Sequence, residues 1–428
     1  MKRKKKNGCR QSDDIVVGLD VGTTKICVIV ARVIDNKSID VLGIGRAPSN
    51  GLHRGIVVNP NKTVESIKKA LEEAELNSGI SISSALVGIA GHYIRCIQTS
   101  SIVGINNPDR IIQEGDIARL LDQAKYLKLP SDTTIIDVIP QEFVIDGKDG
   151  IFDSPFGMFG TKLEAKVNII TGLVSSIDDL SNCVTSCGID VDDIVLEPIA
   201  SSHAVLDDTE KKVGVGMIDI GGGTSDIAVF KKGVLKYTAG IGIAGNLVTN
   251  DIVEALGITD EEAERIKKDY GYASVSEILN DELITVQSIR ANTPKKTSKS
   301  ILARIIQARM QDIFELSAIE IQNSQIAKEL HAGVVLTGGG SLIKGTKELA
   351  EDILGTEVSL GSPRGLRGGL SKEVESPIYS TAVGLVLHKF RTKEEEIRIM
   401  NGGKKKVGIK VRNKENILVK IKKWFDEF

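Results

Sequence analysis

The sequence predicts a mixed α/β fold made of two similar halves, and three observations support this prediction. The chain has 428 residues, which exceeds the roughly 250 to 300 residues that one compact core usually holds. A unit of strand, acidic residue, glycine turn and second strand occurs around Asp20 and again around Asp219. Segments with helical and strand patterns alternate along the rest of the chain, which is typical of the α/β class.

The first copy of the unit begins with a β-branched run at residues 15–19 that leads to Asp20. The turn Val21-Gly22-Thr23-Thr24 follows, and a second apolar run covers residues 26–30. Two apolar runs around a polar turn predict a β-hairpin. An acidic side chain is therefore expected at the end of a strand, next to the turn.

The second copy runs from residues 213–218 through Asp219-Ile220-Gly221-Gly222-Gly223-Thr224-Ser225-Asp226 to residues 227–230. A third glycine turn, Thr337-Gly338-Gly339-Gly340-Ser341, follows a predicted strand at residues 334–336 and opens a helix near Lys347. Glycines allow backbone N–H groups to approach an anion closely. Any one of these turns could be a plain tight turn, but three of them in one chain favour a phosphate site.

The other elements follow from the spacing of apolar residues. We expect a helix at residues 62–76, strands at residues 85–89, 133–138 and 166–171, and a long helix at residues 299–330.

The C-terminal part of the chain differs in composition from the rest. Residues 391–413 are charged and nearly free of large apolar side chains, which predicts a linker. In residues 414–428 the apolar side chains fall at helical spacing, and three lysines lie off that stripe. The stripe consists of Ile417, Leu418, Ile421, Trp424, Phe425 and Phe428, and the lysines are Lys420, Lys422 and Lys423. Such a short amphipathic helix suits the surface of a membrane, although docking on its own domain is the alternative.

Composition excludes several other classes of function. The chain has 55 basic and 57 acidic residues and only 4% aromatic residues, so neither charge nor stacking side chains indicate nucleic-acid binding. The basic start at residues 1–6 lacks the apolar region of a secretory signal, and no apolar run reaches the ~20 residues needed to span a bilayer. The five cysteines form no C-x-x-C pair, which favours reduced thiols in the cytoplasm.

The residue types around the three turns suit a nucleotide bound with Mg²⁺. Hydroxyl groups of Thr23, Thr24 and Thr224 add donors to the glycine backbone for phosphate oxygens. Mg²⁺ keeps much of its hydration shell and is held by carboxylates directly or through water. Asp20 and Asp219, each at a strand end and followed by such a turn, are therefore the carboxylates that a nucleotide site with a hydrated Mg²⁺ would need.

Taken together, these motifs resemble the superfamily of ATPases that includes actin, sugar kinases and DnaK-type chaperones. The two phosphate patterns are Asp20 to Lys25 and Asp219 to Asp226, and the adenosine pattern is Thr337 to Ser341. The superfamily's two connecting helices match Glu197-Pro198-Ile199-Ala200-Ser201-Ser202 and Ser380-Thr381-Ala382-Val383-Gly384 of this chain. The resemblance implies an actin-like ATPase fold in which Asp20 and Asp219 organise Mg²⁺ and Glu197 positions the attacking water, with hydrolysis weak or regulatory.

The resemblance also implies a set of nucleotide contacts. Glu264 and Lys267 match the superfamily's ribose and adenine contacts, but an exposed helix would carry similar charges. The implied cofactor-binding residues are Gly22, Thr23, Thr24, Lys25, Gly221, Gly222, Gly223, Thr224, Asp226, Glu264, Lys267, Gly338, Gly339, Gly340 and Ser341.

Within the superfamily, the order of segments is similar to that of the FtsA family of bacterial division proteins. A stretch of residues is inserted before Glu197, and the chain closes with the linker and the amphipathic segment. The local sequences Gly51-Leu52-x-x-Gly55, Gly240 to Thr249 and Val334 to Lys344 resemble this family as well. A pilus or cell-shape adaptor of the same architecture, or a small-molecule kinase, are the competing interpretations.

This resemblance implies a layout of domains and partners. FtsA-type proteins polymerise, tether FtsZ filaments to the cytoplasmic face of the cell membrane at the division septum, and recruit later division proteins. Arg309 matches a position implicated in docking the FtsZ C-terminal tail, although a solvated arginine is the plainer explanation. The expected layout is a basic disordered start (1–12), a first-half core (13–83 and 171–200), an inserted subdomain for filament contacts (84–170), a second-half core (201–250 and 328–390), a nucleotide- and partner-binding subdomain (251–327), a linker (391–413) and a membrane-binding helix (414–428).

Overall fold

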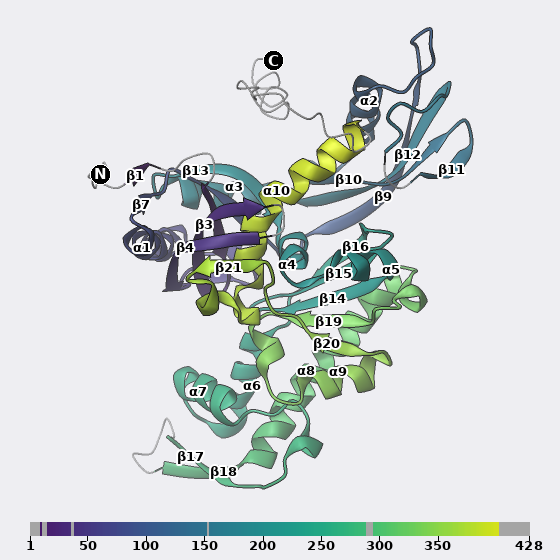
Figure 1. Cartoon of the computed structure of the whole chain (residues 1–428). Helices are drawn as coiled ribbons and strands as arrows, with labels where there is room; N and C mark the ends of the chain where they lie inside the picture. Colours follow the sequence, from purple (N-terminus) through teal and green to yellow (C-terminus); the bar gives the residue numbers. More distant parts are fainter. Residues whose placement is uncertain (1–8, 11–14, 36–37, 152–153, 288–293, 402–428) are drawn as a thin grey trace.

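Two β-sheets with the same strand topology form the centre of the molecule (Figure 1). The computed structural model describes residues 9–10, 15–35, 38–151, 154–287 and 294–401. Most of the predicted disordered start therefore lies outside the described residues. The predicted membrane helix at residues 414–428 lies entirely outside them. No helix within the described ranges is long and apolar enough to cross a membrane.

The first sheet has the strand order β13-β8-β2-β3-β4-β21. Its strands are β2 (Ile15–Val21), β3 (Lys25–Asp35), β4 (Ser38–Pro48), β8 (Ser84–Ile89), β13 (Asp190–Leu196) and β21 (Leu366–Gly369). Two helices, α1 (Pro60–Ser78) and α3 (Val174–Thr185), accompany this sheet. Four short strands form two separate pairs, β1 (Cys9–Arg10) with β7 (Ile80–Ser81) and β5 (Leu52–His53) with β6 (Ile56–Val57).

The second sheet has the order β16-β15-β14-β19-β20. Its strands are β14 (Val215–Ile220), β15 (Ser225–Lys231), β16 (Val234–Ile241), β19 (Val334–Thr337) and β20 (Val358–Leu360). The helices α4 (Glu197–Val205), α5 (Asp208–Val213) and α9 (Thr346–Leu354) contact this sheet. Helix α10 (Ser380–Asn401) packs on α4 and on strands β2, β3 and β8 of the first sheet. In both sheets an antiparallel run of three strands is followed by two parallel strands, which confirms the predicted duplication.

Both predicted hairpins are present in the expected register. Asp20 faces Cys27 across β2 and β3, and Asp219 faces Asp226 across β14 and β15. Strand β2 is buried on both faces, with successive residues packing in different cores. A Cβ atom on Gly18 would lie 2.8 Å from the carbonyl oxygen of Ala382, so this glycine lets α10 pack directly on the strand.

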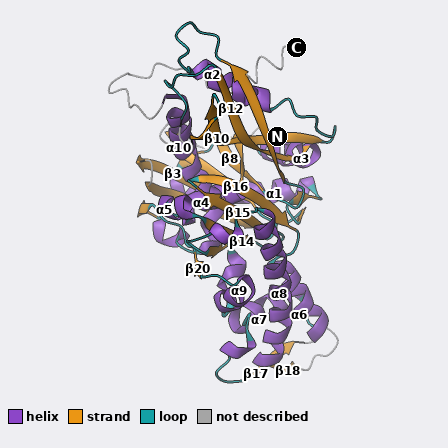
Figure 2. Cartoon of the chain, turned by 90° about the vertical axis from the view of Figure 1, so that its right-hand side faces the viewer, coloured by secondary structure: helices purple, strands orange, loops and turns teal. Residues whose placement is uncertain are grey.

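The inserted subdomain has its own four-stranded antiparallel sheet, of order β11-β10-β12-β9, and one helix (Figure 2). Its elements are β9 (Arg95–Gly104), α2 (Glu114–Ala124), β10 (Thr133–Ile145), β11 (Lys148–Ile151) and β12 (Lys162–Leu173). The sequence-based boundary at residue 84 was wrong, because β8 pairs with β2 and β13 and so belongs to the first sheet.

Two buried amides dock this subdomain on the second half. Gln141 Nε2 donates to the Leu235 carbonyl at 2.8 Å, and Asn168 Nδ2 donates to the carbonyls of Leu235 at 3.1 Å and Lys236 at 2.8 Å. The two carbonyl groups belong to β16, which continues the hairpin of the second glycine turn. The insert is thus held to the strand pair that leaves the phosphate turn.

At the opposite end of the molecule lies a mostly helical subdomain (Figures 1 and 2). It contains α6 (Gly245–Leu256), α7 (Asp260–Tyr270), β17 (Leu283–Gln287), β18 (Pro294–Ser298) and α8 (Lys299–Asn323). Helix α8 is shorter than the predicted helix at residues 299–330, because Gln325 adopts a left-handed backbone conformation (φ 63°) just after the Ser324 cap. A separate 3₁₀ turn follows at Ala327–Glu329.

Two further boundaries differ from the prediction. Strand β21 pairs with β4 and joins the first sheet, although residues 328–390 were assigned to the second half. Helix α10 continues to Asn401, so the linker does not begin at residue 391. The charged residues after Arg391 are good helix formers, and charge alone does not end a helix.

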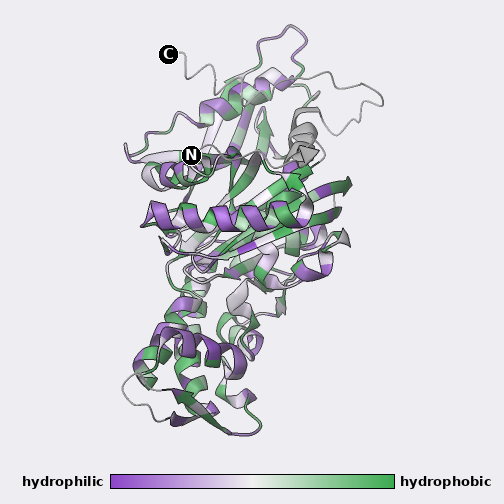
Figure 3. Ribbon diagram, turned by 90° about the vertical axis from the view of Figure 1, so that its left-hand side faces the viewer, coloured by the Kyte–Doolittle hydropathy of each residue, from purple (hydrophilic) through white to green (hydrophobic). Residues whose placement is uncertain are grey.

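Figure 3 shows the general pattern, with hydrophobic residues along the central strands and hydrophilic residues on outward-facing helices.

Candidate functional site

The first and second glycine turns touch each other between the two sheets. Gly222 lies against the Thr24 hydroxyl and Gly223 against the Thr23 hydroxyl, so closely that a Cβ atom on either glycine would overlap them. Thr24 Oγ1 also donates to Asn246 Oδ1 of α6 at 3.1 Å. The fold therefore brings together the hydroxyls and glycines that the sequence predicts around a phosphate group.

Asp219 is the most constrained carboxylate of the site. Its Oδ2 accepts a hydrogen bond from Ser201 of α4 at 2.7 Å and a long one from Thr381 of α10 at 3.4 Å. Gly338, with a φ of 81°, lies against Oδ1, and a Cβ atom there would overlap the carboxylate. Asp219 thus links both connecting helices to the third glycine turn.

Ser201 and Thr381 were not among the predicted site residues. Both lie in the connecting-helix motifs of the sequence, which carried the signal, but a hydroxyl on a helix does not by itself show which carboxylate it supports. Their hydroxyls also lie 3.0 Å apart. They act as positioning residues that fix the rotamer of Asp219.

Asp20 and Asp226 complete the acidic lining. Burial raises the pKa of Asp20 to about 6, against the lowering effect of Lys25, and the nearby Asp219 adds to the rise. Burial and Asp219 raise the pKa of Asp226 to about 7, although Thr224 Oγ1 donates to its Oδ2 at 2.9 Å. Burial also raises the pKa of Asp219 itself.

Glu197 is the first residue of α4 and the fourth acidic group of the site. Burial, followed by the charges of Asp20, Asp226 and Asp219, raises its pKa well above the ordinary value. A small cavity of about 30 Å³ lies beside it, lined also by Gly22, Thr23, Gly55, Gly88 and Thr224 among others. That volume is room for about two or three waters, since one water needs roughly 10 to 15 Å³ of such space.

Three buried carboxyl groups, Asp20, Asp219 and Asp226, and the half-buried Glu197 interact electrostatically and form a cation-attracting site. Among the described residues, no three His, Cys, Asp or Glu side chains are close enough to hold a metal ion together. A hydrated Mg²⁺ needs only one or two carboxylates, because it keeps several waters. Burial is the main cause of the raised pKa values of Asp20, Asp219 and Asp226. A cation beside these carboxylates would offset that cost, so the residues fit a hydrated Mg²⁺.

Lys25 is the basic residue at the end of the first turn, and its charge opposes the effect of burial, which raises the pKa of Asp20 and Asp219. Its Nζ donates to the carbonyl oxygen of Ile378 at 2.7 Å and lies 4.3 Å from the centre of the Tyr379 ring. Ile378 is also the neighbour of Gly339 in the third turn. Lys25 therefore connects the first turn with the third.

In the third turn, the predicted contacts differ in exposure. Gly339 is exposed, whereas Gly340 packs on Ile220 and Ser341 is buried. Ser341 Oγ donates to the Gly338 carbonyl at 2.7 Å. The Ser341 hydroxyl thus closes the turn.

Glu264 and Lys267 of α7 lie next to the second turn. Lys267 Nζ contacts Glu264 Oε2 at 2.6 Å, Thr249 Oγ1 at 2.7 Å and the Gly245 carbonyl at 3.0 Å. Gly245 N in turn donates to the Gly221 carbonyl at 3.1 Å. Burial alone would raise the pKa of Glu264, but Lys267 lowers it to about 2.

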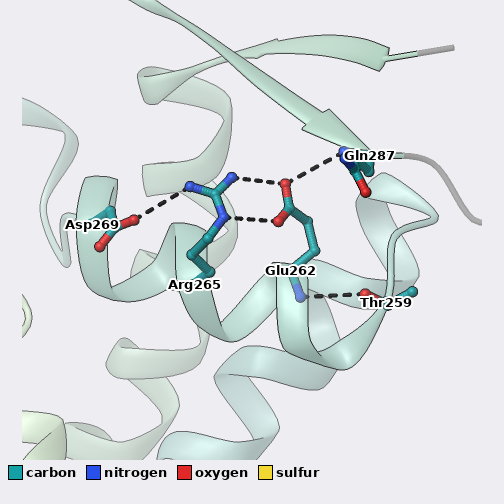
Figure 4. Close-up of polar contacts among 5 residues, drawn as sticks. All are labelled: Thr259, Glu262, Arg265, Asp269 and Gln287. Atoms are coloured by element: carbon teal, nitrogen blue, oxygen red, sulfur yellow. Dashed lines mark hydrogen bonds and ion pairs between the residues drawn. The ribbon is translucent and has the colours of Figure 1, made fainter.

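Arg265, between these two residues in sequence, belongs to a different face of α7. Its guanidinium pairs with Glu262 and Asp269, and Glu262 also accepts from the backbone of Gln287 (Figure 4). Only Glu264 and Lys267 are therefore directed toward the turns.

Arg309 lies away from the carboxylate cluster, on α8. Its Nε and Nη2 donate to the two oxygens of Asp251 at 2.7 Å and 3.1 Å, and its Nη1 donates to Asp312 at 2.9 Å. The side chain is about one quarter exposed. An acidic peptide would have to share this guanidinium with two carboxylates of the chain.

We expect Asp226→Asn to stabilise the nucleotide-free protein in a pH-dependent way. Because the pKa of Asp226 is raised from 3.8 to about 7, its contribution to stability is fully present below about pH 4 and is lost as the pH rises through 7. The asparagine variant escapes this loss, so its advantage in urea unfolding should grow by about 1 to 3 kcal/mol between pH 5 and pH 8. An advantage of Asp226→Asn that is the same at both pH values would contradict the assignment.

Comparison with known proteins identifies the family of the chain. The family model described as "Cell division protein FtsA" matches residues 216–384, and the model "SHS2 domain inserted in FTSA" matches residues 91–171. Cell division protein FtsA of Pseudomonas aeruginosa is 40% identical over 414 residues, which cover 97% of this chain and 98% of that protein. The chain belongs to the FtsA family. The FtsA of Bacillus subtilis is 38% identical, covering 88% of this chain and 83% of that protein.

Solved structures confirm the actin-like fold of this FtsA-family chain. The "PilM-PilN type IV pilus biogenesis complex" has a TM-score of 0.63 at 15% identity, covering 88% of this chain and 98% of that one. MreB5 of Spiroplasma citri bound to ADP has a TM-score of 0.55 at 15% identity, covering 89% and 98%. The high identity to FtsA proteins, compared with 15% to the pilus protein, assigns the chain a role in cell division rather than in pilus assembly.

Proposed function

We propose that the chain is an ATP-binding, actin-like scaffold that polymerises on the cytoplasmic face of the cell membrane and attaches FtsZ filaments there at the division septum. Later division proteins are recruited to this scaffold. The observation that carries the proposal is the cluster of three buried carboxyl groups and the half-buried Glu197 at the touching glycine turns, in a chain of the FtsA family.

ATP would bind between the two halves with Mg²⁺ beside its phosphates. Glycines and threonines of the first two turns would hold the phosphates, and the exposed Gly339 marks the side of the third turn available to the nucleoside. Asp20 and Asp219 would hold Mg²⁺ through its waters, and the ion would place positive charge beside these buried carboxyl groups. The MreB5 structure of the same fold is bound to ADP, which supports nucleotide binding by this chain.

Glu197 would orient a water for slow ATP hydrolysis. It borders the cavity that has room for about two or three waters, beside Gly22 and Thr224. Positioning within ~1 Å decides such a rate, since a misplacement of this size can cost about a hundredfold. We propose that hydrolysis is regulatory and that the bound nucleotide mainly controls assembly.

Membrane attachment would come from the amphipathic segment at residues 414–428. Its apolar stripe, which includes Trp424 and Phe425, would enter the bilayer interface, and each of its lysines would add about 1 kcal/mol on an anionic surface. A single segment of this length binds weakly and reversibly. Filaments would bind far more tightly, because later segments attach as intramolecular events.

The proposal is tested by flotation of FtsZ filaments with anionic liposomes. FtsZ should float only when this chain and Mg-ATP are both present, and FtsZ without its C-terminal tail should stay in the soluble fraction. Flotation of FtsZ without this chain, or its failure to float with the chain, Mg-ATP and liposomes together, would overturn the proposed function.

We expect Arg309→Ala to weaken binding of an FtsZ C-terminal tail peptide by about tenfold or more. Losing a charge-assisted hydrogen bond costs roughly 1.5 to 3 kcal/mol, and Asp251 would then repel an acidic peptide. Arg265→Ala is the matched control, because Arg265 is also paired with two carboxylates but on α7. Equal affinities of the parent and both variants in a calorimetric titration would remove Arg309 from the docking site.

A further inference from the structure

The inserted subdomain carries an apolar hollow beside the first turn of α2. The hollow has a volume of about 460 Å³ and is lined by Ile111, Ile112, Gln113, Glu114, Gly115 and Phe156. This size is within the roughly 300 to 1,000 Å³ of ligand pockets. Next to it, the side chains of Phe159 and Met158 are 73% and 40% exposed. Exposed large apolar side chains around a hollow mark an interaction surface.

The hollow is built on fixed backbone. Ile112 N donates to the Met158 carbonyl at 2.9 Å, and Gly157 N donates to the Ile112 carbonyl at 2.9 Å. Ile111 and Phe159 also form an antiparallel bridge. The exposed phenylalanine is therefore held in place next to the hollow.

The C-terminal part of the chain leaves the described structure close to this surface. Helix α10 begins in the core with α4 and β2, and it contacts α2 (Figures 1 and 2). Helix α2 has 11 residues, so it is about 16 Å long. Residues 402–413 can span up to about 40 Å when extended. The segment at residues 414–428 can therefore reach the hollow from the end of α10.

The chemistry of that segment fits the hollow. Its stripe contains large apolar side chains, including Trp424 and Phe425, and its other face contains Lys420, Lys422 and Lys423. Glu114 in the first turn of α2 is exposed and lines the hollow, whereas Asp116 is buried and paired with Arg119 at 2.7 Å. Apolar contacts on one face and opposite charges at the rim would hold the segment in a defined orientation.

We propose that residues 414–428 dock in the hollow formed by Ile111, Ile112, Phe156 and the first turn of α2 when the protein is off the membrane. Docking covers the apolar stripe in the soluble monomer and competes with its insertion into lipid. This inference rests on the proposed membrane function of the same segment. The apparent affinity for lipid is then reduced by the fraction of molecules that are docked.

Trp424 reports the state of the segment directly, because it is the only tryptophan of the chain. In the full-length protein without lipid, its emission should be blue-shifted, shielded from acrylamide and independent of protein concentration. Phe159→Ser and the charge reversal Glu114→Lys should each shift the emission to the red and strengthen binding to anionic liposomes about three- to tenfold. Leu279→Ser, at an apolar side chain 94% exposed on the opposite end of the molecule, is the matched control and should change neither.

The outcomes separate this inference from the proposed function. A solvent-like emission without lipid that turns blue with liposomes would overturn docking and leave membrane binding intact. A blue emission that neither the two variants nor liposomes change would overturn both. Loss of the blue shift on dilution would also overturn docking within one chain, because the hollow would then hold the segment of a second copy. If Phe159→Ser changes filament assembly but leaves the Trp424 emission unchanged, docking is overturned. The hollow is then a contact between copies of the chain.

Discussion

Asp219→Ala will weaken Mg-ATP binding by about tenfold to a hundredfold. This carboxylate accepts from Ser201 and Thr381, lies against Gly338, and faces the other three acidic groups of the site. Its removal takes away a charge available to Mg²⁺ and releases the three elements that it connects. Losing a charge-assisted contact costs roughly 1.5 to 3 kcal/mol. Isothermal titration calorimetry with Mg-ATP measures the effect.

The fold of the Asp219→Ala variant should be retained, because the pKa of this buried carboxyl is already raised and its charge adds no stability. Asp190→Ala, at an exposed position on β13, is the control and should bind Mg-ATP like the parent. Nucleotide affinity that is unchanged in Asp219→Ala would show that the carboxylate cluster is not the Mg-ATP site.

Trp424→Glu will release the protein from anionic liposomes, with an affinity at least tenfold lower. Burying a large apolar side chain contributes about 1.5 to 3 kcal/mol, and a carboxylate is repelled by the same anionic surface. Cosedimentation with liposomes over a range of lipid concentrations measures the loss. Binding of Mg-ATP should be unaffected, because residues 414–428 include none of the site residues.

Trp424→Phe is the matched control for this variant. It keeps an aromatic side chain at the same position of the stripe, so most of the liposome binding should remain. If Trp424→Glu sediments with liposomes as well as the parent does, residues 414–428 are not the anchor.

The central site was predictable because its pattern is local. Each hairpin is encoded by two apolar runs around a glycine turn, and the position of Asp20 and Asp219 at the strand ends follows from that pattern. The pairing of the halves was predictable because the unit occurs twice. Neither prediction needed knowledge of which distant segments pack together.

The features that the sequence did not predict depend on long-range packing. Strand β8 reads equally well as part of an insert or of the first sheet until its pairing with β2 is known. The role of Ser201 depends on where the acidic end of β14 lies relative to α4. The charged residues after Arg391 resemble a linker in composition, but they continue α10, whose first turns pack on α4 and β2.

The most direct test of the central claim compares binding to anionic liposomes with and without Mg-ATP as the protein concentration rises. Assembly on the membrane predicts a steep binding curve and at least tenfold tighter binding with Mg-ATP, because neighbouring protomers share their membrane contacts. In Asp219→Ala the curve should stay shallow under both conditions. Identical curves for the parent with and without Mg-ATP would contradict an ATP-controlled membrane scaffold.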